Sequence, residues 1–397
     1  MKIYLVGGAV RDELLGLPVR ERDWLVVGGT PEQMVLQGYT PVGKGFPVFL
    51  HPQTKEEYAL ARTERKTGIG YGGFTFYTGV DVTAAEDLCR RDLTINAIAK
   101  DETGRITDPY NGLADLKKKI LRHVSPAFTE DPLRVLRVAR FAARFFHKGF
   151  SVAPETMELM KKISQTGELD SLPGERVWQE TITALNTNNP EIYFEILYQC
   201  GALIYFFPTL RENYQPADNN MCCPASTAMM MAAEEGQNSL IRFACGFTPW
   251  KSCLADSVAC YQQISAMVKQ LKIPSKYAEV LLAVVQHLPD LIAVEKTDTE
   301  TLLRCLERMD AFRRYERFLV ITTACDYLLR AAKKQRGQQG WLKEAASACQ
   351  KVNVGKIVAK GLRGRQLADE IRTARLKKIE KCLHAAGTPC PDNRAGQ

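Results

Sequence analysis

The sequence excludes several classes of protein through what it lacks. No uninterrupted apolar stretch reaches the roughly 18–20 residues that span a bilayer, and the first residues lack the long apolar core of a signal peptide. The 12 cysteines are scattered and form no C-x-x-C pair, so neither a zinc ribbon nor a thioredoxin-like site is supported. Scattered cysteines without an export signal are typical of buried, reduced thiols. We therefore expect a cytoplasmic protein.

The composition is that of a globular protein, but the charge is unevenly distributed. Hydrophobic residues make up 45% and charged residues 25% of the 397 residues, which argues against wholesale disorder and allows two to four domains. The net charge is +8, yet residues 330–397 carry 16 Lys and Arg against 5 Asp and Glu. This segment is therefore at +11 and the remainder near −3. The asymmetry indicates that one end of the molecule holds a polyanion.

The first 125 residues and the remainder follow different patterns. Short β-type runs at 3–6, 24–27, 46–50 and 57–62 and an amphipathic stretch at 9–15 predict an α+β or α/β domain. The glycine-rich residues 67–73 predict a loop suited to movement. From about residue 125 the spacing is helical throughout. The runs are 133–146, 153–165, 176–187, 191–205, 225–245, 254–271, 275–295, 300–332 and 363–385.

Two features near the N-terminus suit a nucleotide and a metal. Gly7-Gly8 follows a strand and opens a helix, so free backbone N–H groups favour a phosphate, and Arg11 adds a positive charge. A tight structural turn is an equally good interpretation. Glu21 and Asp23 face the same side of an extended strand, and Glu57 supplies a third carboxylate. Such carboxylates suit Mg²⁺; the alternative is an exposed acidic turn.

Two arginine-rich segments follow. Arg90-Arg91 stand between Asp87 and Asp92, which suits either phosphate oxygens or a surface salt-bridge cluster. Further along, four arginines have spacings of three, three and four, so they share one helical face; these are Arg134, Arg137, Arg140 and Arg144. The opposite positions are apolar and suit a core: Val135, Leu136, Val138, Ala139, Phe141 and Ala142. Because Asp131 offsets only part of the repulsion in this stripe, we favour an anion-binding role over a solvated face.

Together these motifs resemble the bacterial, class II branch of the CCA-adding tRNA nucleotidyltransferases, and in particular the gammaproteobacterial type. The resemblance rests on collinear motifs at 5–12, 21–23, 58–66, 90–97, 108–112, 130–145 and 172–178. It implies an α+β fold with a polymerase-β-like nucleotidyltransferase head at 1–125. An all-helical neck at 126–210 would read the nucleotide base, a helical body would span 211–330, and a basic helical tail at 331–397 would bind tRNA.

The resemblance also implies a reaction and residue roles. The reaction is template-independent addition and repair of the 3′-terminal CCA of tRNA from CTP and ATP, with release of pyrophosphate. Catalysis would fall to Glu21, Asp23 and Glu57, with Glu21 and Asp23 as ligands in a two-metal Mg²⁺ mechanism. The nucleotide-binding residues would be Gly8, Arg11, Arg91, Asp131, Arg134, Arg137 and Arg140. Asp131 would accept from the base amino group and Arg134 would donate to the ring nitrogen, an order that cytosine and adenine share and uracil and guanine reverse.

The sequence departs from the family in two places. The first metal site is normally Asp-x-Asp, whereas here it is Glu21-x-Asp23. The extra methylene moves the carboxylate by about 1.5 Å, so we expect reduced activity with Mg²⁺ and greater tolerance of Mn²⁺. Relatives often carry a phosphohydrolase domain built on His and His-Asp ligands, but no histidine occurs between His147 and His287 and no His-Asp dipeptide exists. The segment 242–249 stands about where the resemblance would place the His-Asp pair. We expect a degenerate phosphohydrolase-like body without hydrolase activity.

Alternative functions remain at this point. A bacterial poly(A) polymerase shares the glycine and Arg-Arg-Asp motifs, although the start at residue 1 and the segment 58–66 favour CCA addition. An enzyme that adds only C or only A fits the same motifs. A catalytically inactive tRNA-binding protein is suggested by Glu21 alone.

The basic C-terminal segment predicts a second binding surface. Its cations include Arg363, Arg365, Arg372, Arg375, Lys377 and Lys378. An enzyme that works on the 3′ end of tRNA gains affinity by holding phosphates of the acceptor and T arms, and we expect this segment to do so. The alternative is a solvated basic helix.

Overall fold

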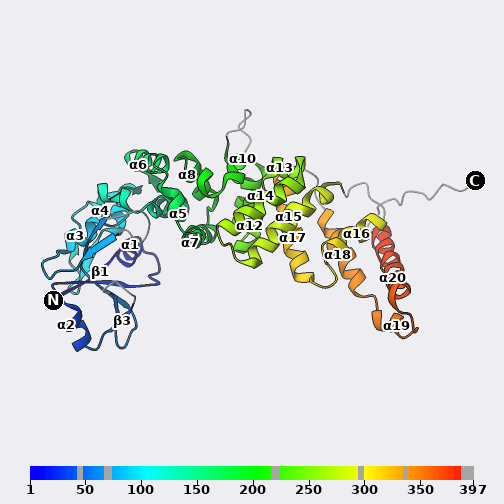
Figure 1. Ribbon diagram of the computed structural model, residues 1–397, viewed down its shortest axis with the longest axis horizontal. Coiled ribbons are helices and arrows are strands. Elements are labelled where there is room, and N and C mark those ends of the chain that lie inside the picture. Colours follow the sequence, from blue (N-terminus) through cyan, green and yellow to red (C-terminus); the bar gives the residue numbers. More distant parts are fainter. Residues whose placement is uncertain (43–47, 67–73, 216–222, 294–298, 334–337, 386–397) are drawn as a thin grey trace, which may run out of the picture. The chain divides into compact units, whose positions relative to one another are not determined.

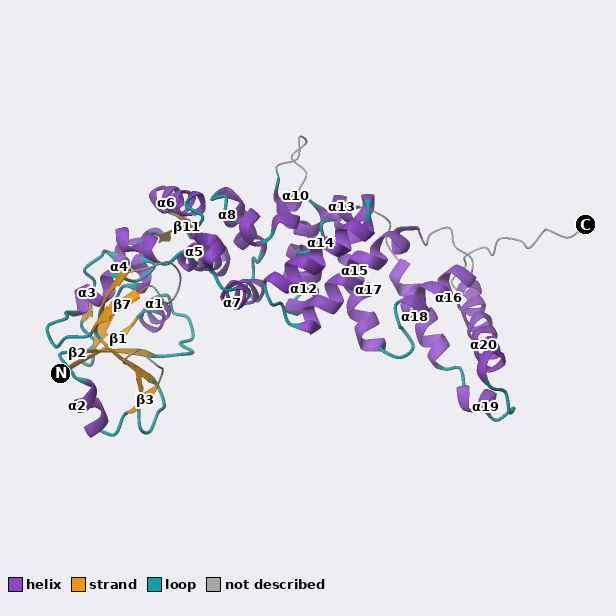
Figure 2. Cartoon of the chain, in the orientation of Figure 1, coloured by secondary structure: helices purple, strands orange, loops and turns teal. Residues whose placement is uncertain are grey.

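The computed structural model describes residues 1–42, 48–66, 74–215, 223–293, 299–333 and 338–385. The chain divides into two compact units, Met1–Phe206 and Phe207–Gln397, and Figures 1 and 2 show a sheet with helices in the first and helices in the second. The predicted head, neck, body and tail are a finer division and stay predictions. No helix of the described part of the chain has the length and apolar character needed to cross a membrane.

A seven-stranded sheet forms the core of the first unit, with the order β3-β4-β5-β2-β1-β8-β9. Neighbouring strands are antiparallel apart from the parallel pair of β2 and β5. The strands of this sheet are β1 (Lys2–Val6), β2 (Asp23–Val27), β3 (Thr40–Val42), β4 (Val48–Leu50), β5 (Glu57–Leu60), β8 (Ala99–Asp101) and β9 (Ile106–Thr107). Two small pairs are β6 (Thr63–Lys66) with β7 (Phe74–Tyr77) and β10 (Ile120–Leu121) with β11 (Ser151–Val152).

Both faces of this sheet are buried, because apolar residues follow one another along β2. Leu25 belongs to a buried cluster on one face with Val6 and Leu88, and Val26 belongs to a cluster on the other face with Met34. Side chains alternate across a strand, so consecutive apolar residues serve opposite faces. The helices of this part are α1 (Gly8–Leu14), α2 (Pro31–Leu36), α3 (Ala84–Cys89) and α4 (Gly112–Lys118).

Five helices complete the first unit. They are α5 (Leu133–Phe145), α6 (Pro154–Gln165), α7 (Gly174–Leu185), α8 (Glu191–Gln199) and α9 (Leu203–Phe206). The helix α5 packs against both α7 and α8. Its apolar side is fully covered: Val135, Leu136, Val138 and Ala139 are 0% exposed. This burial fixes which side of α5 carries the arginines.

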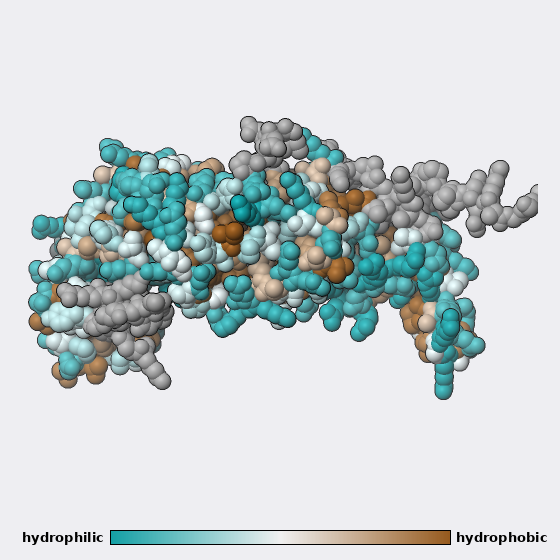
Figure 3. Space-filling model, turned by 45° about the horizontal axis from the view of Figure 1, so that its top comes forward, coloured by the Kyte–Doolittle hydropathy of each residue, from teal (hydrophilic) through white to brown (hydrophobic). Residues whose placement is uncertain are grey.

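The second unit is helical throughout its described residues. Its helices are α10 (Arg211–Tyr214), α11 (Pro224–Glu234), α12 (Ser239–Gly246), α13 (Trp250–Ala255), α14 (Ser257–Gln270), α15 (Ser275–Ala293), α16 (Thr299–Arg308), α17 (Tyr315–Ala331), α18 (Gln338–Gln350), α19 (Val354–Val358) and α20 (Gly364–Ala385). Apolar side chains occupy the segment where metal ligands of a phosphohydrolase were expected, since Phe243, Ala244, Cys245 and Phe247 are 0% exposed. Figure 3 shows mostly hydrophilic residues on the visible face of the molecule.

The structure divides several of the predicted helical runs. The run 191–205 is α8 and α9, with Gly201 at φ 78° between them, and the run 254–271 begins in α13 and continues in α14. The run 225–245 is two helices, because Gly236 turns the chain with φ 70° and the Asn238 side chain caps the start of α12. The run 300–332 is also two helices, and Asp310 between them has φ 55°. The predicted loop at 67–73 lies outside the described residues.

Candidate active site

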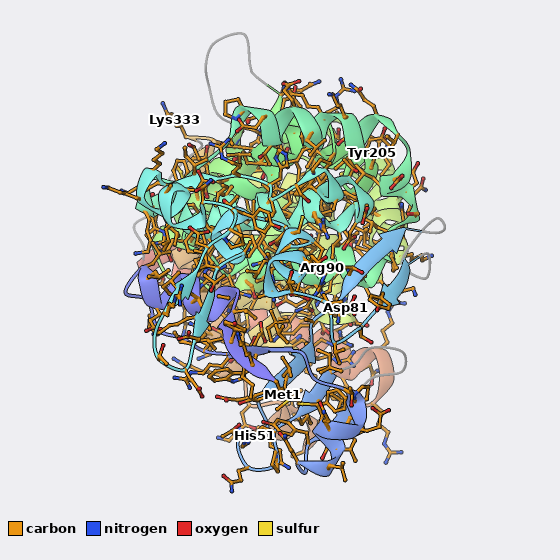
Figure 4. The ribbon with its side chains drawn as sticks, turned by 90° about the vertical axis from the view of Figure 1, so that its left-hand side faces the viewer. Met1, His51, Asp81, Arg90, Tyr205 and Lys333 are labelled. Carbon is orange, nitrogen blue, oxygen red and sulfur yellow. The ribbon has the colours of Figure 1, made fainter. Side chains whose placement is uncertain are left out.

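A pocket in the first unit gathers most of the predicted catalytic and nucleotide-binding residues. It has a volume of about 510 Å³ and is lined by nine arginines and three aspartates, so its charge suits a polyphosphate. The predicted residues that line it are Gly8, Arg11, Asp23, Arg91, Asp131, Arg134, Arg137 and Arg140. Glu21 and Glu57 are exposed and are not among the lining residues. In Figure 4, Arg90, another lining residue, lies well apart from His51 beside β4.

The predicted catalytic carboxylates lie at one end of two neighbouring strands. Asp23 begins β2 and Glu57 begins β5, and the two are register partners in the parallel pair. Paired residues point to the same face of a sheet, so both carboxylates share the face of Leu25. Burial raises the pKa of Asp23, the charge of Arg91 opposes this rise, and the charge of Glu21 adds to it. Glu21 and Asp23 are therefore close enough to repel each other.

The donor chemistry of this edge fits a hard cation. Within the described residues, no three His, Cys, Asp or Glu side chains form a group that could hold a metal ion. Mg²⁺ in nucleotide-processing sites is usually held by one or two carboxylates together with substrate phosphates. Glu21 and Asp23 supply such a pair of oxygen donors, and the remaining ligands would come from the substrate and water.

The Gly7-Gly8 turn brings the backbone against an arginine. Gly7 has φ 70°, and a Cβ atom there would lie 2.7 Å from Nη1 of Arg91. Arg91 in turn lies 3.5 Å from the carboxylate of Asp87. The backbone conformation thus favours glycine at position 7, and a Cβ atom there would displace the end of the Arg91 side chain. The turn is structural, and both of its glycines also line the pocket.

Arg11 is the most enclosed cation of the pocket. It is 3% exposed, and its Nε donates to Asp12 at 2.9 Å while its Nη1 donates to Asn96 at 2.5 Å. Its guanidinium lies 5.1 Å from the ring centroids of both Phe141 and Phe145, within the range of cation–π attraction. Burial lowers the pKa of Arg11. The N–H groups of the Arg11 guanidinium thus link α1 to Asn96, and the guanidinium also contacts two phenylalanine rings of α5.

Carboxylates from outside α5 pair with three arginines of the stripe, whose mutual repulsion Asp131 was expected to offset only in part. Arg137 Nε donates to Asp92 at 2.7 Å, Arg140 Nε donates to Glu180 at 2.5 Å, and Arg144 Nη2 donates to Asp12 at 2.8 Å. The sequence did not identify these partners because they belong to other elements. All four arginines of the stripe line the pocket, as expected for one face.

One residue of the predicted core face also belongs to the pocket. Phe141 is 4% exposed, as expected of a core residue, yet it lines the cavity. The guanidinium of Arg140 lies 4.3 Å from its ring centroid. The ring of Phe141 therefore forms part of the pocket wall, and the guanidinium of Arg140 lies over it.

Asp92 and Arg137 form a close ion pair in the site, with 2.7 Å between their nearest atoms. Burial alone would raise the pKa of Asp92, but the charge of Arg137 and hydrogen bonds from Asn96 and Arg137 hold it well below its usual range. The charge of Asp92 raises the pKa of Arg137. Both groups are thus charged at neutral pH.

The two predicted base-reading residues are held in fixed orientations. Arg134 is 7% exposed, and its guanidinium donates to the backbone carbonyls of Ala127 at 2.7 Å and Arg90 at 2.5 Å. Asp131 accepts from the Leu133 N–H at 3.0 Å. A carboxylate acceptor and a guanidinium donor therefore line the same pocket with restricted freedom.

Sequence reasoning missed several residues of the site. Asp12 and Asn96 lie within motifs that it used, but neither was given a role, and only their contacts with Arg11 reveal one. Glu180 lies outside every motif that was singled out, although it follows Arg176 by one helical turn. Arg62 and Arg176 line the pocket as well.

The basic C-terminal residues that the sequence singled out differ in their surroundings, and their role in tRNA binding stays a prediction. Arg363, Arg365, Lys377 and Lys378 are exposed. Arg372 instead donates to both carboxylate oxygens of Glu300, at 2.7 and 2.6 Å. Arg375 lies 3.8 Å from the ring centroid of Phe312. These two arginines attach α20 to its own unit.

The fold and site define a nucleotidyltransferase, and comparison with known proteins agrees. A family described as the poly A polymerase head domain matches residues 3–122, and a probable RNA and SrmB-binding site of polymerase A matches residues 149–213. Among solved structures, the Bacillus stearothermophilus CCA-adding enzyme in complex with CTP has a TM-score of 0.61 at 23% identity, covering 96% of this chain and 89% of that one. The Thermotoga maritima CCA-adding enzyme complexed with tRNA has a TM-score of 0.62 at 20% identity, covering 97% and 91%. These two likenesses establish the fold.

Sequence relatives establish the family. The multifunctional CCA protein of Pseudomonas savastanoi pv. phaseolicola is 44% identical, with 97% of this chain and 100% of the relative covered. That of Pseudomonas fluorescens is 45% identical, with 96% and 98% covered. The chain belongs to the bacterial CCA-adding tRNA nucleotidyltransferases of the gammaproteobacterial type.

Proposed function

We propose that this chain adds and repairs the 3′-terminal CCA of tRNA, using CTP and ATP and releasing pyrophosphate, without a nucleic-acid template. The observation that carries the proposal is the arginine-lined pocket, whose lining includes Asp23 at the end of a strand together with Asp131 and Arg134. The expected location is the cytoplasm.

The phosphates and the metal would meet at the strand ends. Mg²⁺ held by Glu21 and Asp23 would supply charge neutralisation for the triphosphate and polarise the attacking 3′-hydroxyl. Glu57 lies in register with Asp23 and would orient that hydroxyl. Gly8 would hold the triphosphate through its backbone N–H, and Arg11 would fix the turn that presents it.

The remaining arginines and the neck would orient the nucleotide. Arg91, Arg137 and Arg140 would donate to phosphate oxygens, each losing part of its present carboxylate contact. Asp131 and Arg134 would select cytosine or adenine, because uracil and guanine would leave these polar groups unpaired beneath the bound base, at about 1–3 kcal/mol each. The fixed guanidinium of Arg134 supports this selectivity. Uracil and guanine present a carbonyl oxygen where cytosine and adenine present an amino group, and a donor held in one orientation cannot move to suit that order.

The exposed part of the basic tail would hold the other end of the substrate. Arg363, Arg365, Lys377 and Lys378 would contact phosphates of the acceptor and T arms. The paired Arg372 and Arg375 would act by holding α20 in place.

A tRNA transcript that lacks its 3′ end, incubated with single labelled nucleotides, tests the proposal. We expect two C residues and then one A, with transcripts ending in C-C accepting only A. Asp23→Asn is the matched inactive control. A long A tract would support poly(A) synthesis, an alternative that the match to a poly A polymerase head domain keeps in view. Single-nucleotide addition would identify a C-only or A-only enzyme, and no incorporation a tRNA-binding protein.

A further inference from the structure

A contact on the back of the sheet joins the two strands that carry the catalytic carboxylates. Trp24 follows Asp23 in β2, and Glu56 precedes Glu57 at the start of β5. The indole Nε1 of Trp24 donates to Oε2 of Glu56 at 2.9 Å. Because side chains alternate across a strand, this contact lies behind the carboxylates and faces away from the pocket.

The contact is reinforced on both sides. Arg22 Nη1 lies 3.5 Å from Oε1 of Glu56, and Thr54 Oγ1 donates to Oε2 at 3.4 Å. The indole of Trp24 also stacks on the ring of Tyr58, with centroids 5.5 Å apart and planes inclined by 14°. Trp24 is thus held at its nitrogen and at its face.

The aromatic support continues beneath Tyr58. His51 stacks on Tyr58 at 5.6 Å, and Tyr39 meets it edge-on at 5.0 Å. Tyr58 itself is 8% exposed. A ring with three aromatic neighbours has little freedom to move, so it provides a rigid base for the indole.

The carboxylates need such support because they lie where the strand pairing ends. Asp23 and Glu57 are the first residues of their strands and register partners, so the pairing of β2 with β5 begins with them. A backbone restraint next to Glu57 comes from the other side, where the His51 N–H donates to the Glu56 carbonyl at 3.0 Å. Mg²⁺ demands near-ideal geometry and tolerates displaced ligands poorly. A contact one residue from each carboxylate is placed to limit such displacement.

We propose that Trp24 and Glu56 are positioning residues that hold Asp23 and Glu57 in register for metal binding. This proposal rests on the proposed function only for its link to catalysis. Neither side chain touches the substrate, and the hydrogen bond acts through the backbone of two adjacent strands.

Substitutions in the full-length protein separate this role from general stability. Trp24→Phe removes the indole donor but keeps a ring on Tyr58. Glu56→Ala removes the acceptor, whereas Glu56→Gln keeps an acceptor for the indole. Glu102→Ala is the matched control, because Glu102 is an exposed glutamate of the same unit.

Two readouts are measured at a temperature where all variants are folded. The first is Mn²⁺ binding to the protein without substrates, followed by electron paramagnetic resonance, with Asp23→Asn defining the site. The second is the Mg²⁺ concentration that gives half the maximal rate of CMP addition. We expect Trp24→Phe and Glu56→Ala each to lower the affinity for Mn²⁺ on the order of 10-fold, as for other residues that orient metal ligands. Each should raise the Mg²⁺ concentration for half-maximal rate by a similar factor. Glu56→Gln and Glu102→Ala should stay within about 2-fold of wild type.

The double variant gives the sharpest test. Because one hydrogen bond joins the two residues, Trp24→Phe with Glu56→Ala should be no weaker than either single variant. Unchanged metal dependence in the single variants, multiplying effects in the double, or no Asp23-dependent Mn²⁺ binding would each overturn the proposal. If the protein adds no CMP, the proposed function is contradicted. If the variants of such a protein still bind Mn²⁺ more weakly than wild type, the positioning role is supported.

Discussion

The arginines of α5 and the cations of α20 have the same sign of charge but different surroundings. In the first unit Arg137 and Arg140 donate to Asp92 and Glu180 at 2.7 and 2.5 Å. In the second unit Lys377 and Lys378 are exposed. Paired, enclosed cations suit a ligand of defined shape, whereas exposed cations attract any polyanion and are screened by salt. The difference is the one we expect if the first set binds the nucleotide and the second holds tRNA.

The largest expected effect comes from the pocket and spares tRNA binding. Asp23→Asn should lower the rate of CMP addition on the order of 10³-fold, because it removes a charge that holds the metal. Its affinity for tRNA, measured by filter binding, should stay within about 2-fold of wild type. A comparable loss of tRNA affinity would contradict the separation of the two regions.

A conservative change in the arginine stripe should act on the nucleotide alone. Arg137→Lys keeps the charge beside Asp92 but loses the forked donor geometry, so kcat/KM for CTP should fall on the order of 10²-fold. Arg122→Lys is the matched control, since Arg122 pairs with Asp115 and is not a lining residue of the pocket. Steady-state kinetics check both variants. Equal losses in the two would show that any arginine of the unit matters equally.

The strands and the helical face of the site could be predicted from the sequence, and the balance of charge could not. The runs at 24–27 and 133–146 correspond to β2 and α5 within one residue at each end, because alternation and helical spacing are local patterns. The partners of Arg137 and Arg144 are Asp92 and Asp12, which are 45 and 132 positions away. No local pattern links such residues, so only the folded chain shows that three of the four arginines in the stripe are paired with carboxylates.

For the C-terminal segment 330–397, the sequence predicted the charge of the surface but not the contacts that its arginines make within the fold. The net charge of 330–397 predicted a basic surface, and the exposed lysines fit that expectation. The sequence did not show that Arg372 is engaged by Glu300 or that Arg375 packs on Phe312, because helical spacing alone does not identify which side of α20 faces its neighbours.

A smaller effect is expected at the metal site. Glu21→Asp restores the shorter side chain of the family pattern, so turnover with Mg²⁺ should rise a few-fold, to roughly 2–5 times wild type, while the advantage of Mn²⁺ should shrink. Parallel rate measurements in the two metals check this. Turnover that is unchanged or lowered in both would contradict the idea that Glu21 limits the rate.

The smallest effect is a pH dependence of stability confined to the pocket. The pKa of Asp92 is lowered in the folded state, so its ionised form stabilises the fold above the unfolded value near pH 3.9. That contribution is lost as the pH falls through the folded pKa. The difference in unfolding free energy between wild type and Asp92→Asn should therefore be constant above about pH 5 and shrink below about pH 4. Urea titrations test this, and Lys378→Gln should show no such change.

The division of labour between the two basic regions is tested most directly by the salt dependence of tRNA binding. In the double variant Lys377→Gln with Lys378→Gln, the plot of log affinity against log salt should become less steep. The magnitude of its negative slope should fall by about 1–2, since each lost phosphate contact removes roughly 0.7–0.9. The KM for CTP should not change. The exposed neighbours Lys117 and Lys118 of α4, changed in the same way, serve as the charge-matched control and should leave the slope unaltered. A slope equal to that of wild type in the tail variant, or a raised KM for CTP, would contradict the account.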